Sequence, residues 1–270
     1  MTEPKVSRVL LPAFSLAKRE LVRFLRQRNR VVGALAQPVL FWAIFGSGLN
    51  ASFRPSMGAA ELSYMEYFFP GTVVLILLLT AIFATISIIE DRNEGFMQSV
   101  LVAPVPPIAI VLGKLAGTTT LAVIQALAIF LLAPVAGLEL SLAVVAKAIP
   151  MLMLIAAGLT ALGFTIAWYS DSTQGFHAVM TAFLMPMWFL SGAFFPASGL
   201  PAWLAWIVTL NPLTYGLAGL RHLLYSGDPA SVAELPALST CLAVSALFSL
   251  LAFAAAVYAV HRPRTAIHGQ

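Results

Sequence analysis

Few side chains in this sequence have the type and spacing that catalysis needs. After the N-terminal region, the densest group of charges is Glu90, Asp91, Arg92 and Glu94. Such a group can bind a partner or pair internally, but no His-Glu-x-x-His zinc motif occurs, and no paired aspartates lie in apolar segments. Ser47 and Ser191 lack the Gly-x-Ser-Gly setting of a membrane serine protease. The sequence therefore predicts no catalytic residue.

Binding of nucleotides, metals or ions by this chain is equally unsupported. Gly113 and Lys114 are followed by Leu115, without the upstream glycine and the hydroxyl of a phosphate-binding loop. Cys241 is the single cysteine, and His177 stands alone. The middles of the apolar segments carry no Asp, Glu, Lys or Arg, which ion-coupled carriers usually need there. We expect no cofactor or metal in this chain, and any ATP and Mg to be bound by another subunit.

The composition indicates that lipid surrounds most of the chain. Of the 270 residues 60% are apolar and 10% are charged, whereas a soluble domain has roughly 25% charged residues. The net charge is +4, but eight of the 15 Lys and Arg residues precede Val31 and the others are scattered. A membrane surface, rather than nucleic acid, is the partner that this charge distribution predicts.

Six apolar segments are long enough to cross a bilayer as helices, each near the roughly 20 residues that a hydrocarbon core of about 30 Å requires. The sequence predicts an all-α membrane protein, with a cytoplasmic interface helix over residues 1–30 and a six-span domain over residues 31–270. The predicted spans are Val31–Leu49, Pro70–Ile89, Leu115–Pro134, Leu142–Trp168, Gly175–Phe195 and Pro236–Val260.

The distribution of Lys and Arg predicts the orientation, because cytoplasmic loops hold the excess. With the N-terminus inside, twelve of these residues are cytoplasmic and only Arg54, Lys147 and Arg221 are outside. The first 30 residues are too charged for a signal peptide. We expect a multi-pass protein of the cell (inner) membrane with both termini in the cytoplasm.

The segment 199–225 is apolar enough to imitate a seventh span. Asn211 and Pro212 interrupt it near its centre, and a seventh crossing would place the basic C-terminus outside. Two short external re-entrant helices before the last span are the better prediction. Such helices need protein or a water-filled cavity around them, so we expect them to line an external vestibule or its lid.

The N-terminal region predicts a basic amphipathic helix. Its apolar positions are Leu10, Phe14, Ala17, Leu21 and Phe24, and arginines at positions 19, 23, 26 and 30 recur on the opposite side. Such a helix lies in the headgroup plane of the anionic cytoplasmic leaflet. The alternative is a topology signal only, but that role would not require the apolar stripe.

The loop over residues 90–114 predicts a short helix along the cytoplasmic surface. Its acidic residues favour a helix start, and Pro104, Pro106 and Pro107 end it. Phe96 and Met97 are apolar residues that we expect to be exposed and to suit docking onto a protein partner. A plain connecting loop is the alternative.

Several motifs together resemble the permease subunits of type-2 ATP-binding-cassette (ABC) exporters, the group that includes daunorubicin-resistance and nodulation-factor permeases. The resemblance covers most of the chain. It rests on the basic N-terminal helix, EDRNEGF at Glu90–Phe96 followed by Ala103-Pro104 and Gly113-Lys114, FLSGAFFP at Phe189–Pro196, LPAWL at Leu200–Leu204, and NPLTY at Asn211–Tyr215 with Arg221. Phe96 departs from the pattern, since many relatives have threonine there.

The resemblance implies a homodimeric six-span permease. It would move a drug, lipid or lipid-linked glycan out of the cytoplasm or inner leaflet, driven by a separate nucleotide-binding subunit. The N-terminal helix and the loop after the second span would contact that ATPase, and the stretch before the last span would form the external re-entrant helices. Two alternatives remain from the residues alone: an ATP-independent facilitator and a structural membrane scaffold.

Three groups of residues are the candidate sites. For ATPase coupling we expect a surface made by Glu90, Asp91, Arg92, Glu94, Gly95, Phe96, Arg19, Arg23 and Arg26. For the pathway or dimer seam we expect the polar or flexible breaks at Gln37, Pro38, Thr181 and Pro186. For the external gate we expect Trp203, Trp206, Asn211, Pro212, Tyr215 and Arg221, of which Arg221 can pair with an acidic neighbour, an anionic headgroup or a sugar acid.

Overall fold

The computed structural model describes residues 7–50, 56–57, 60–196 and 200–261. Its fold is a helical bundle, and six of the described helices are long and apolar enough to cross a membrane, which confirms the predicted all-α membrane fold. These helices are α2 (Arg28–Leu49), α3 (Tyr64–Asn93), α5 (Pro107–Phe130), α6 (Leu142–Tyr169), α7 (Thr173–Trp188) with its π-helical extension η2 (Phe189–Ala193), and α10 (Leu238–His261).

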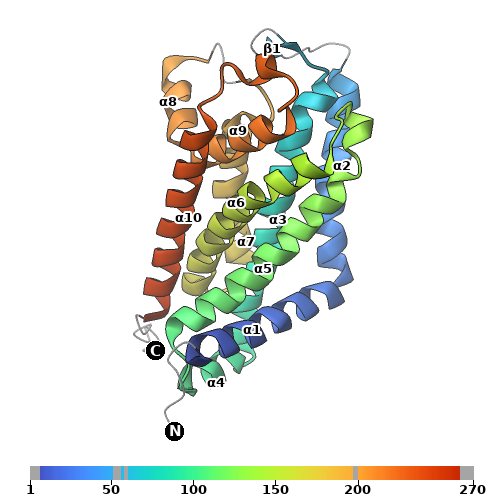
Figure 1. Ribbon diagram of the computed structural model, residues 1–270. Coiled ribbons are helices and arrows are strands. Elements are labelled where there is room, and N and C mark those ends of the chain that lie inside the picture. Colours follow the sequence, from blue (N-terminus) through green and yellow to red (C-terminus); the bar gives the residue numbers. More distant parts are fainter. Residues whose placement is uncertain (1–6, 51–55, 58–59, 197–199, 262–270) are drawn as a thin grey trace.

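The remaining elements lie at the two ends of the bundle (Figure 1). At one end α1 (Ser7–Arg26) runs across the spans, close to α4 (Phe96–Val102). At the other end are α8 (Ala202–Leu210), α9 (Pro212–Leu224), the 3₁₀ turns η1 (Ala133–Ala136) and η3 (Pro229–Val232), and a two-residue antiparallel pair, β1 (Ser56–Met57) with β2 (Ala60–Glu61). The described chain begins and ends at the α1 end.

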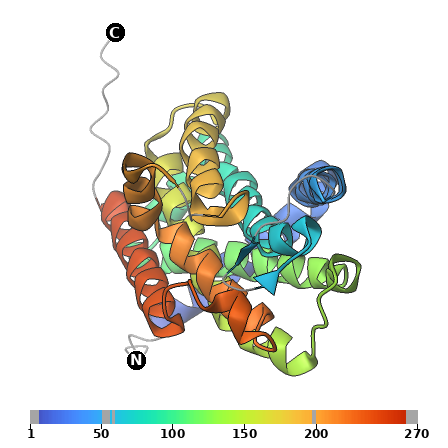
Figure 2. The ribbon, with the colours of Figure 1, turned by 90° about the horizontal axis from the view of Figure 1, so that it is seen from above.

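Helix α3 forms the centre of the fold. In its most apolar stretch of 18 residues 94% of the residues are buried, whereas only 22% are buried in the corresponding stretches of α2 and α10. Seen from above, α2 stands at one edge of the bundle and α10 at the opposite edge (Figure 2). The exposed residues of α2 and α10 are largely apolar, as expected for helices whose surroundings are lipid rather than water.

Two predicted spans begin too late. Helix α3 starts at Tyr64 rather than Pro70, because the Ser63 side chain caps it by accepting a hydrogen bond from the Glu66 amide at 3.1 Å. Helix α5 starts at Pro107 rather than Leu115, since proline is well tolerated at the first helical position. The predicted coupling loop over 90–114 is therefore mostly the last turn of α3 and the first turns of α5, with α4 between them.

The predicted pair of short helices before the last span is confirmed. Asn211 ends α8 and caps α9, where its side-chain oxygen accepts a hydrogen bond from the Leu213 amide at 3.0 Å. Its amide nitrogen donates to the Met187 carbonyl at 2.6 Å, which ties the break to the end of α7. Gly199, the first residue of the predicted segment 199–225, lies outside the described residues, as do Lys5, Arg54, Arg262 and Arg264 from the charge count.

Candidate functional site

Asp91, in the last turn of α3, is the centre of a network of charges. Its side chain is fully buried. Arg19 of α1 binds it with both guanidinium nitrogens, at 2.7 and 3.0 Å, and Arg23 donates to the same carboxylate. The hydrogen bond to Asp91 raises the pKa of Arg19 above its usual value, so the guanidinium stays charged. Two arginines of α1 thus clamp one carboxylate of α3.

Lys114 of α5 approaches this carboxylate from another helix. Its Nζ lies 2.6 Å from Asp91 Oδ2 and 2.6 Å from Glu20 Oε2 of α1, and 3.0 Å from Ser87 Oγ. Ser87 in turn donates to the other oxygen of Glu20. Lys114 and Glu20 are 4% and 3% exposed. The three helices α1, α3 and α5 therefore meet in a buried ion cluster whose donors and acceptors are paired.

Glu90 extends the network to the surface and to α2. It accepts a hydrogen bond from Arg23 at 2.8 Å and pairs with Arg30 of α2. Glu94 lies 3.7 Å from Arg23, but its side chain is 62% exposed. The inner part of the network is thus shielded from solvent, whereas its rim, at Glu94, is open to it.

Close backbone packing holds α1 beside this cluster. A Cβ atom at Gly113 of α5 would lie 2.7 Å from the Ala13 carbonyl oxygen, and one at Gly117 would lie 2.8 Å from that of Ala17. Only glycine allows α5 to approach the α1 backbone so closely. The four-residue spacing of these glycines matches that of Ala13 and Ala17 on the facing helix.

This docking shows which way the side chains of α1 point. The arginine face does not point away from the protein, because Asp91 and Glu90 draw Arg19 and Arg23 inward. The predicted apolar stripe is also divided: Phe24 is buried against the bundle, whereas Leu10 and Phe14 are 59% and 72% exposed. The helix ends at Arg26, so Arg30 belongs to α2.

Helix α4 has the predicted length of about two turns. Gly95 precedes it with a φ of +78°, a left-handed conformation that favours glycine. The predicted exposure of Phe96 and Met97 is wrong: Met97 is buried, and the Arg19 guanidinium lies 3.6 Å above the centroid of the half-buried Phe96 ring. The exposed apolar residues of α4 are Leu101 and Val102.

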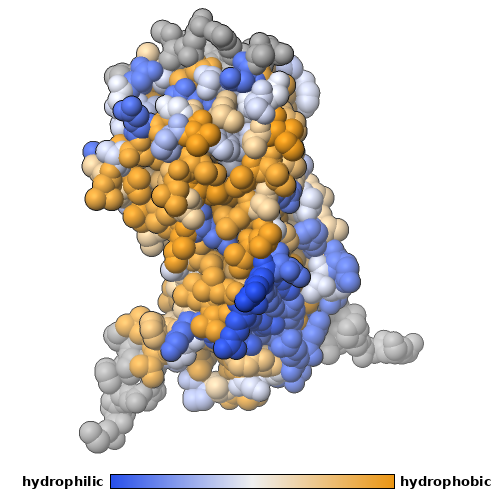
Figure 3. All heavy atoms as spheres, turned by 90° about the vertical axis from the view of Figure 1, so that its right-hand side faces the viewer, coloured by the Kyte–Doolittle hydropathy of each residue, from blue (hydrophilic) through white to orange (hydrophobic). Residues whose placement is uncertain are grey.

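The remaining predicted coupling residues differ in their surroundings. Arg92 donates to the carbonyl oxygens of Trp168 and Ser170, at the end of α6. Arg26 is exposed on α1. Figure 3 shows a hydrophilic patch at the α1 end, below an apolar surface that covers the middle of the molecule. The structure thus brings the predicted residues to one end of the bundle, but it turns most of their charges inward.

Sequence reasoning did not assign Glu20, Ser87 and Lys114 to this site. The sequence places Lys114 at the end of the predicted coupling loop 90–114 and in the Gly113-Lys114 pair of the resemblance, without a partner for its charge. The sequence does hold a signal for this pairing. Lys114, seven residues after the start of α5, is the single charged residue of that helix, and Glu20 is the single acidic residue of α1. Charged side chains near apolar helices need partners of opposite charge.

The predicted seam residues lie on α2 and α7, which both pack against α3. Thr181 and Pro186 are exposed on α7, Gln37 is half-buried on α2, and Pro38 is buried. His177 of α7 stacks on Phe83 of α3 with ring centroids 6.0 Å apart. The outer faces of both helices carry exposed apolar side chains, namely Val32, Leu40 and Ile44 of α2 and Val179 and Phe183 of α7.

The predicted gate residues divide into exposed and structural ones. Trp203 and Trp206 of α8 are 66% and 68% exposed. Pro212 occupies the first turn of α9, beside the Asn211 cap. Tyr215 donates to the Thr209 carbonyl oxygen at 3.0 Å, which fixes the angle between α8 and α9.

Arg221 is buried and holds the end of α7. Its Nη2 donates to the Gly192 carbonyl oxygen at 2.9 Å, and its guanidinium lies 4.3 Å from the Tyr67 ring centroid. Tyr67 also donates to the Gly192 carbonyl, at 2.7 Å. Within the described residues no carboxylate pairs with Arg221. Arg221 is therefore a structural tie, and of the three partners considered for it, an acidic neighbour is not found in the described part of the chain.

Comparison with known proteins adds an independent observation. The family model described as "ABC-2 type transporter" matches residues 13–225. A putative transport permease, ycf38, of Cyanophora paradoxa is 30% identical over 216 residues, which are 78% of this chain and 73% of that protein. Nodulation protein J of Sinorhizobium fredii is 30% identical over 193 residues, 71% of this chain and 72% of that protein. The inner membrane transport permease YadH of Escherichia coli is 26% identical over 216 residues, 77% and 80% of the two chains.

Proposed function

The chain belongs to the ABC-2 type transporter family, and on that premise we propose that it is the membrane-spanning permease subunit of an ATP-driven exporter. A separate nucleotide-binding subunit would bind ATP and Mg and hydrolyse the nucleotide. The observation that carries this proposal is the buried cluster of Asp91, Lys114, Glu20 and Arg19. Ionisable side chains at this depth are expensive, and they are usually kept for a function.

The proposed orientation places the α1 end of the bundle in the cytoplasm. The described basic residues on that side include Lys18, Arg26 and Arg28, which are exposed. Positive charge of this kind favours the cytoplasmic face. With this orientation α8 and α9 lie on the external side, and the ATPase approaches α1 and α4.

In the proposed coupling, exposed residues at the rim of the site would bind the ATPase, and the buried ion pairs would transmit its movement to the spans. Glu94, Arg26, Leu101 and Val102 are exposed and can contact the ATPase. Arg19, Arg23, Asp91 and Lys114 would carry the resulting displacement, because they join α1 to α3 and α5 with hydrogen-bonded ion pairs. A movement of α4 would then shift packed helices as bodies rather than bend one loop.

Two copies of the chain would form the transport pathway between them. The outer faces of α2 and α7 are apolar, and each helix contains a proline, the buried Pro38 in α2 and the exposed Pro186 in α7. Gln37 and Thr181 add a polar group to each face. These helices support a seam that can open and close, with a second identical copy as the partner.

The cargo class follows from the proposed walls of this seam. The described residues of α2 and α7 carry no Asp, Glu or Lys, and their basic side chains are Arg28 and Arg30 at the start of α2 and His177 near the start of α7. An ion leaving water would find no compensating charges there. We therefore infer a hydrophobic or amphipathic cargo, such as a drug, a lipid or a lipid-linked glycan, whose exit Trp203 and Trp206 of α8 would border.

Co-purification tests this function. The chain is co-expressed with a candidate nucleotide-binding ATPase and reconstituted in lipid vesicles, and both ATP hydrolysis and release of an amphipathic fluorescent cargo are measured. We expect a stable complex whose cargo movement requires ATP. Cargo movement without ATP would indicate a facilitator, and a chain that neither binds an ATPase nor moves cargo would indicate a scaffold.

A further inference from the structure

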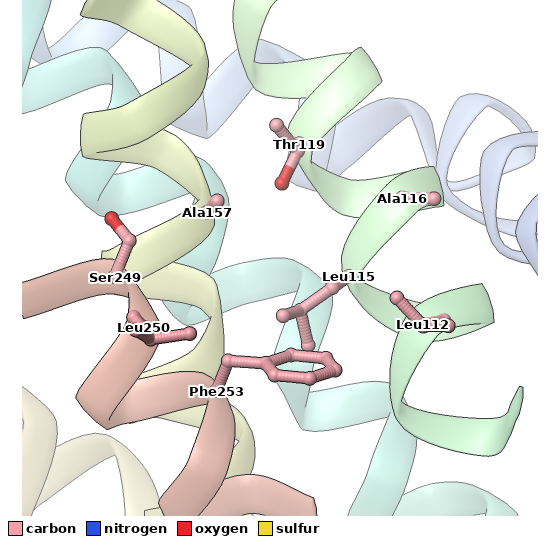
Figure 4. Close-up of a pocket in the computed structure, with 8 residues that line it drawn as sticks. All are labelled: Leu112, Leu115, Ala116, Thr119, Ala157, Ser249, Leu250 and Phe253. Atoms are coloured by element: carbon pink, nitrogen blue, oxygen red, sulfur yellow. The ribbon is translucent and has the colours of Figure 1, made fainter. Parts of the chain in front are cut away.

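A groove on the side of the bundle is lined by α5, α6 and α10. Its volume is about 380 Å³, within the range of roughly 300–1,000 Å³ that is common for ligand sites. Figure 4 shows the side chains around it. They are Leu112, Leu115, Ala116 and Thr119 of α5, Ala157 of α6, and Ser249, Leu250 and Phe253 of α10.

The groove exists because α10 packs closely on α6 while small residues leave space beside α5. Gly158 of α6 allows this packing, since a Cβ atom there would lie 2.6 Å from the Phe248 ring. Ala116 and Ala157 are too small to fill the gap between the helices. Leu112, Leu250 and Phe253 form its walls.

The depth of the groove places it within the hydrocarbon of the bilayer. Ser249 and Phe253 lie 12 and 8 residues before His261, at the α1 end of α10, which is about 12–18 Å along the helix axis. Ala157 lies 12 residues before Tyr169, the last residue of α6, or about 18 Å. The groove thus faces acyl chains rather than headgroups.

The chemistry of the lining favours an apolar occupant. The Ser249 hydroxyl already donates to the Leu154 and Ser245 carbonyl oxygens, at 2.6 and 2.9 Å. The Thr119 side chain is 93% buried; its hydroxyl has no hydrogen-bond partner among the described residues and points into the groove (Figure 4). One hydroxyl without a partner is a weak polar feature in a lining that is otherwise carbon.

We propose that this groove binds one acyl chain of a membrane phospholipid from the leaflet on the α1 side. Its rim is continuous with the exposed apolar surface of α10 at Leu247, Leu250 and Leu251, on a helix that is long and apolar enough to cross a membrane. An acyl chain can therefore enter from the bilayer without crossing a polar barrier. This proposal does not depend on ATP-driven export.

The bound chain would support the helix that carries the charge cluster. Leu112 and Leu115 flank Gly113 and Lys114 in the sequence, so the groove and the α1 contact occupy neighbouring faces of the same turns of α5. Filling the groove would hold α5 against α1. Lipid binding and the docking of α1 should accordingly strengthen each other.

Photolabelling of the full chain tests the proposal. The protein is reconstituted in nanodiscs with a phosphatidylcholine that carries a diazirine within one acyl chain, irradiated, and mapped by peptide mass spectrometry. We expect labels concentrated between Leu112 and Thr119 and between Ser249 and Phe253. Labelling spread evenly over all lipid-exposed helices would overturn the proposal.

Four variants identify the occupant. Ala116→Trp and Ala157→Phe fill the groove from different helices and should abolish the concentrated labels. Ala255→Trp, an exposed position on α10 that points away from Phe253, should retain them. Thr119→Val should also retain them, whereas their loss in this variant would mean that a polar ligand is held by hydrogen bonding.

A second copy of the chain is the other possible occupant. Native mass spectrometry of the same samples reports both bound phospholipid and oligomeric state. Loss of phospholipid from Ala116→Trp with an unchanged oligomeric state supports the proposal. Dissociation of a dimer by this substitution, or phospholipid binding equal to that of the unsubstituted chain, contradicts it.

Discussion

Lys114 and Asp91 form an almost completely buried ion pair, with Nζ 2.6 Å from Oδ2, between two helices that are both candidate membrane spans. The pair is not isolated, because Glu20 and Arg19 of α1 complete the charge balance around it. A buried ion pair adds little net stability, but removing one partner costs about 3–5 kcal/mol. The cluster is thus sensitive to any single change.

A double-mutant cycle tests the link between Glu20 and Lys114. Glu20→Gln and Lys114→Met should each lower the stability of the purified protein, since each removes one member of a buried ion pair. The double variant should lose less than the sum of the two, with an interaction term within the range of roughly 0.5–3 kcal/mol seen for contacting groups. Denaturant unfolding in detergent measures the four values, and strict additivity would contradict the pairing.

Because α1 and α5 lie so close together, one added methyl group between them should destabilise the protein. Gly113→Ala and Gly117→Ala place a Cβ atom against the α1 backbone, and overpacking of this kind costs about 1–3 kcal/mol. Hydrogen exchange over residues 7–26 should become faster in both variants. Gly48→Ala in α2 is the matched control, because nothing lies within 4 Å of its Cβ position. Slow exchange in all three variants would show that α1 does not need this contact.

Substitutions near the proposed gate should differ in their effect on stability, with a loss at the buried positions Gly192 and Arg221 and little change at exposed ones. Gly192 has a φ of +83°, so Gly192→Ala should cost about 1–2 kcal/mol from backbone strain. Arg221→Ala removes both a hydrogen bond to Gly192 and the Tyr67 contact, and it should also lower the melting temperature. Trp203→Ala and Trp206→Ala are exposed changes and should leave stability within about 0.5 kcal/mol.

This difference decides which variants can test a gate. Loss of export in Arg221→Ala is uninformative when the variant is unstable. Loss of export in Trp203→Ala with ATP hydrolysis retained would support a gating role for α8. Normal export in both tryptophan variants would leave α8 as a membrane anchor.

Docking of the ATPase on α4 predicts a strong effect of charge on its exposed apolar end. Leu101 and Val102 are 49% and 85% exposed, so Leu101→Asp and Val102→Asp should fold normally. Both should reduce co-purification of the ATPase, because a desolvated carboxylate would face the interface. Leu210→Asp, equally apolar but at the opposite end of the bundle, is the control. An ATPase that binds all three variants equally would exclude docking at α4.

The sequence was sufficient for the architecture because lipid imposes a simple rule. Long apolar segments such as 142–168, which carries a single charge at Lys147 near one end, must be helices, and Asn211 with Pro212 must interrupt one. Helix ends were less accurate where caps and prolines decide them, as at Ser63 and Pro107. Periodicity also identified α1 as a helix with two unlike faces.

Periodicity does not show which face of a helix packs against the bundle and which faces solvent or headgroups. A stripe of arginines at positions 19 and 23 reads as a solvent- or headgroup-facing surface until the position of Asp91 is known. Likewise, Phe96 and Met97 look exposed in a charged loop, yet Arg19 covers one and the bundle buries the other. Pairing between distant helices depends on tertiary structure, which a single sequence does not show.

The most direct test of the account is the ratio of ATP hydrolysed to cargo exported in vesicles that contain the chain and the proposed ATPase subunit. Asp91→Asn removes the charge that joins α1, α3 and α5, and Glu94→Gln removes a neighbouring exposed charge as the control. For Asp91→Asn complexes that still assemble, we expect the ratio to rise several-fold, as a lost coupling free energy of about 1–3 kcal/mol would produce. An unchanged ratio in Asp91→Asn, or an equal rise in Glu94→Gln, would contradict coupling through the buried cluster.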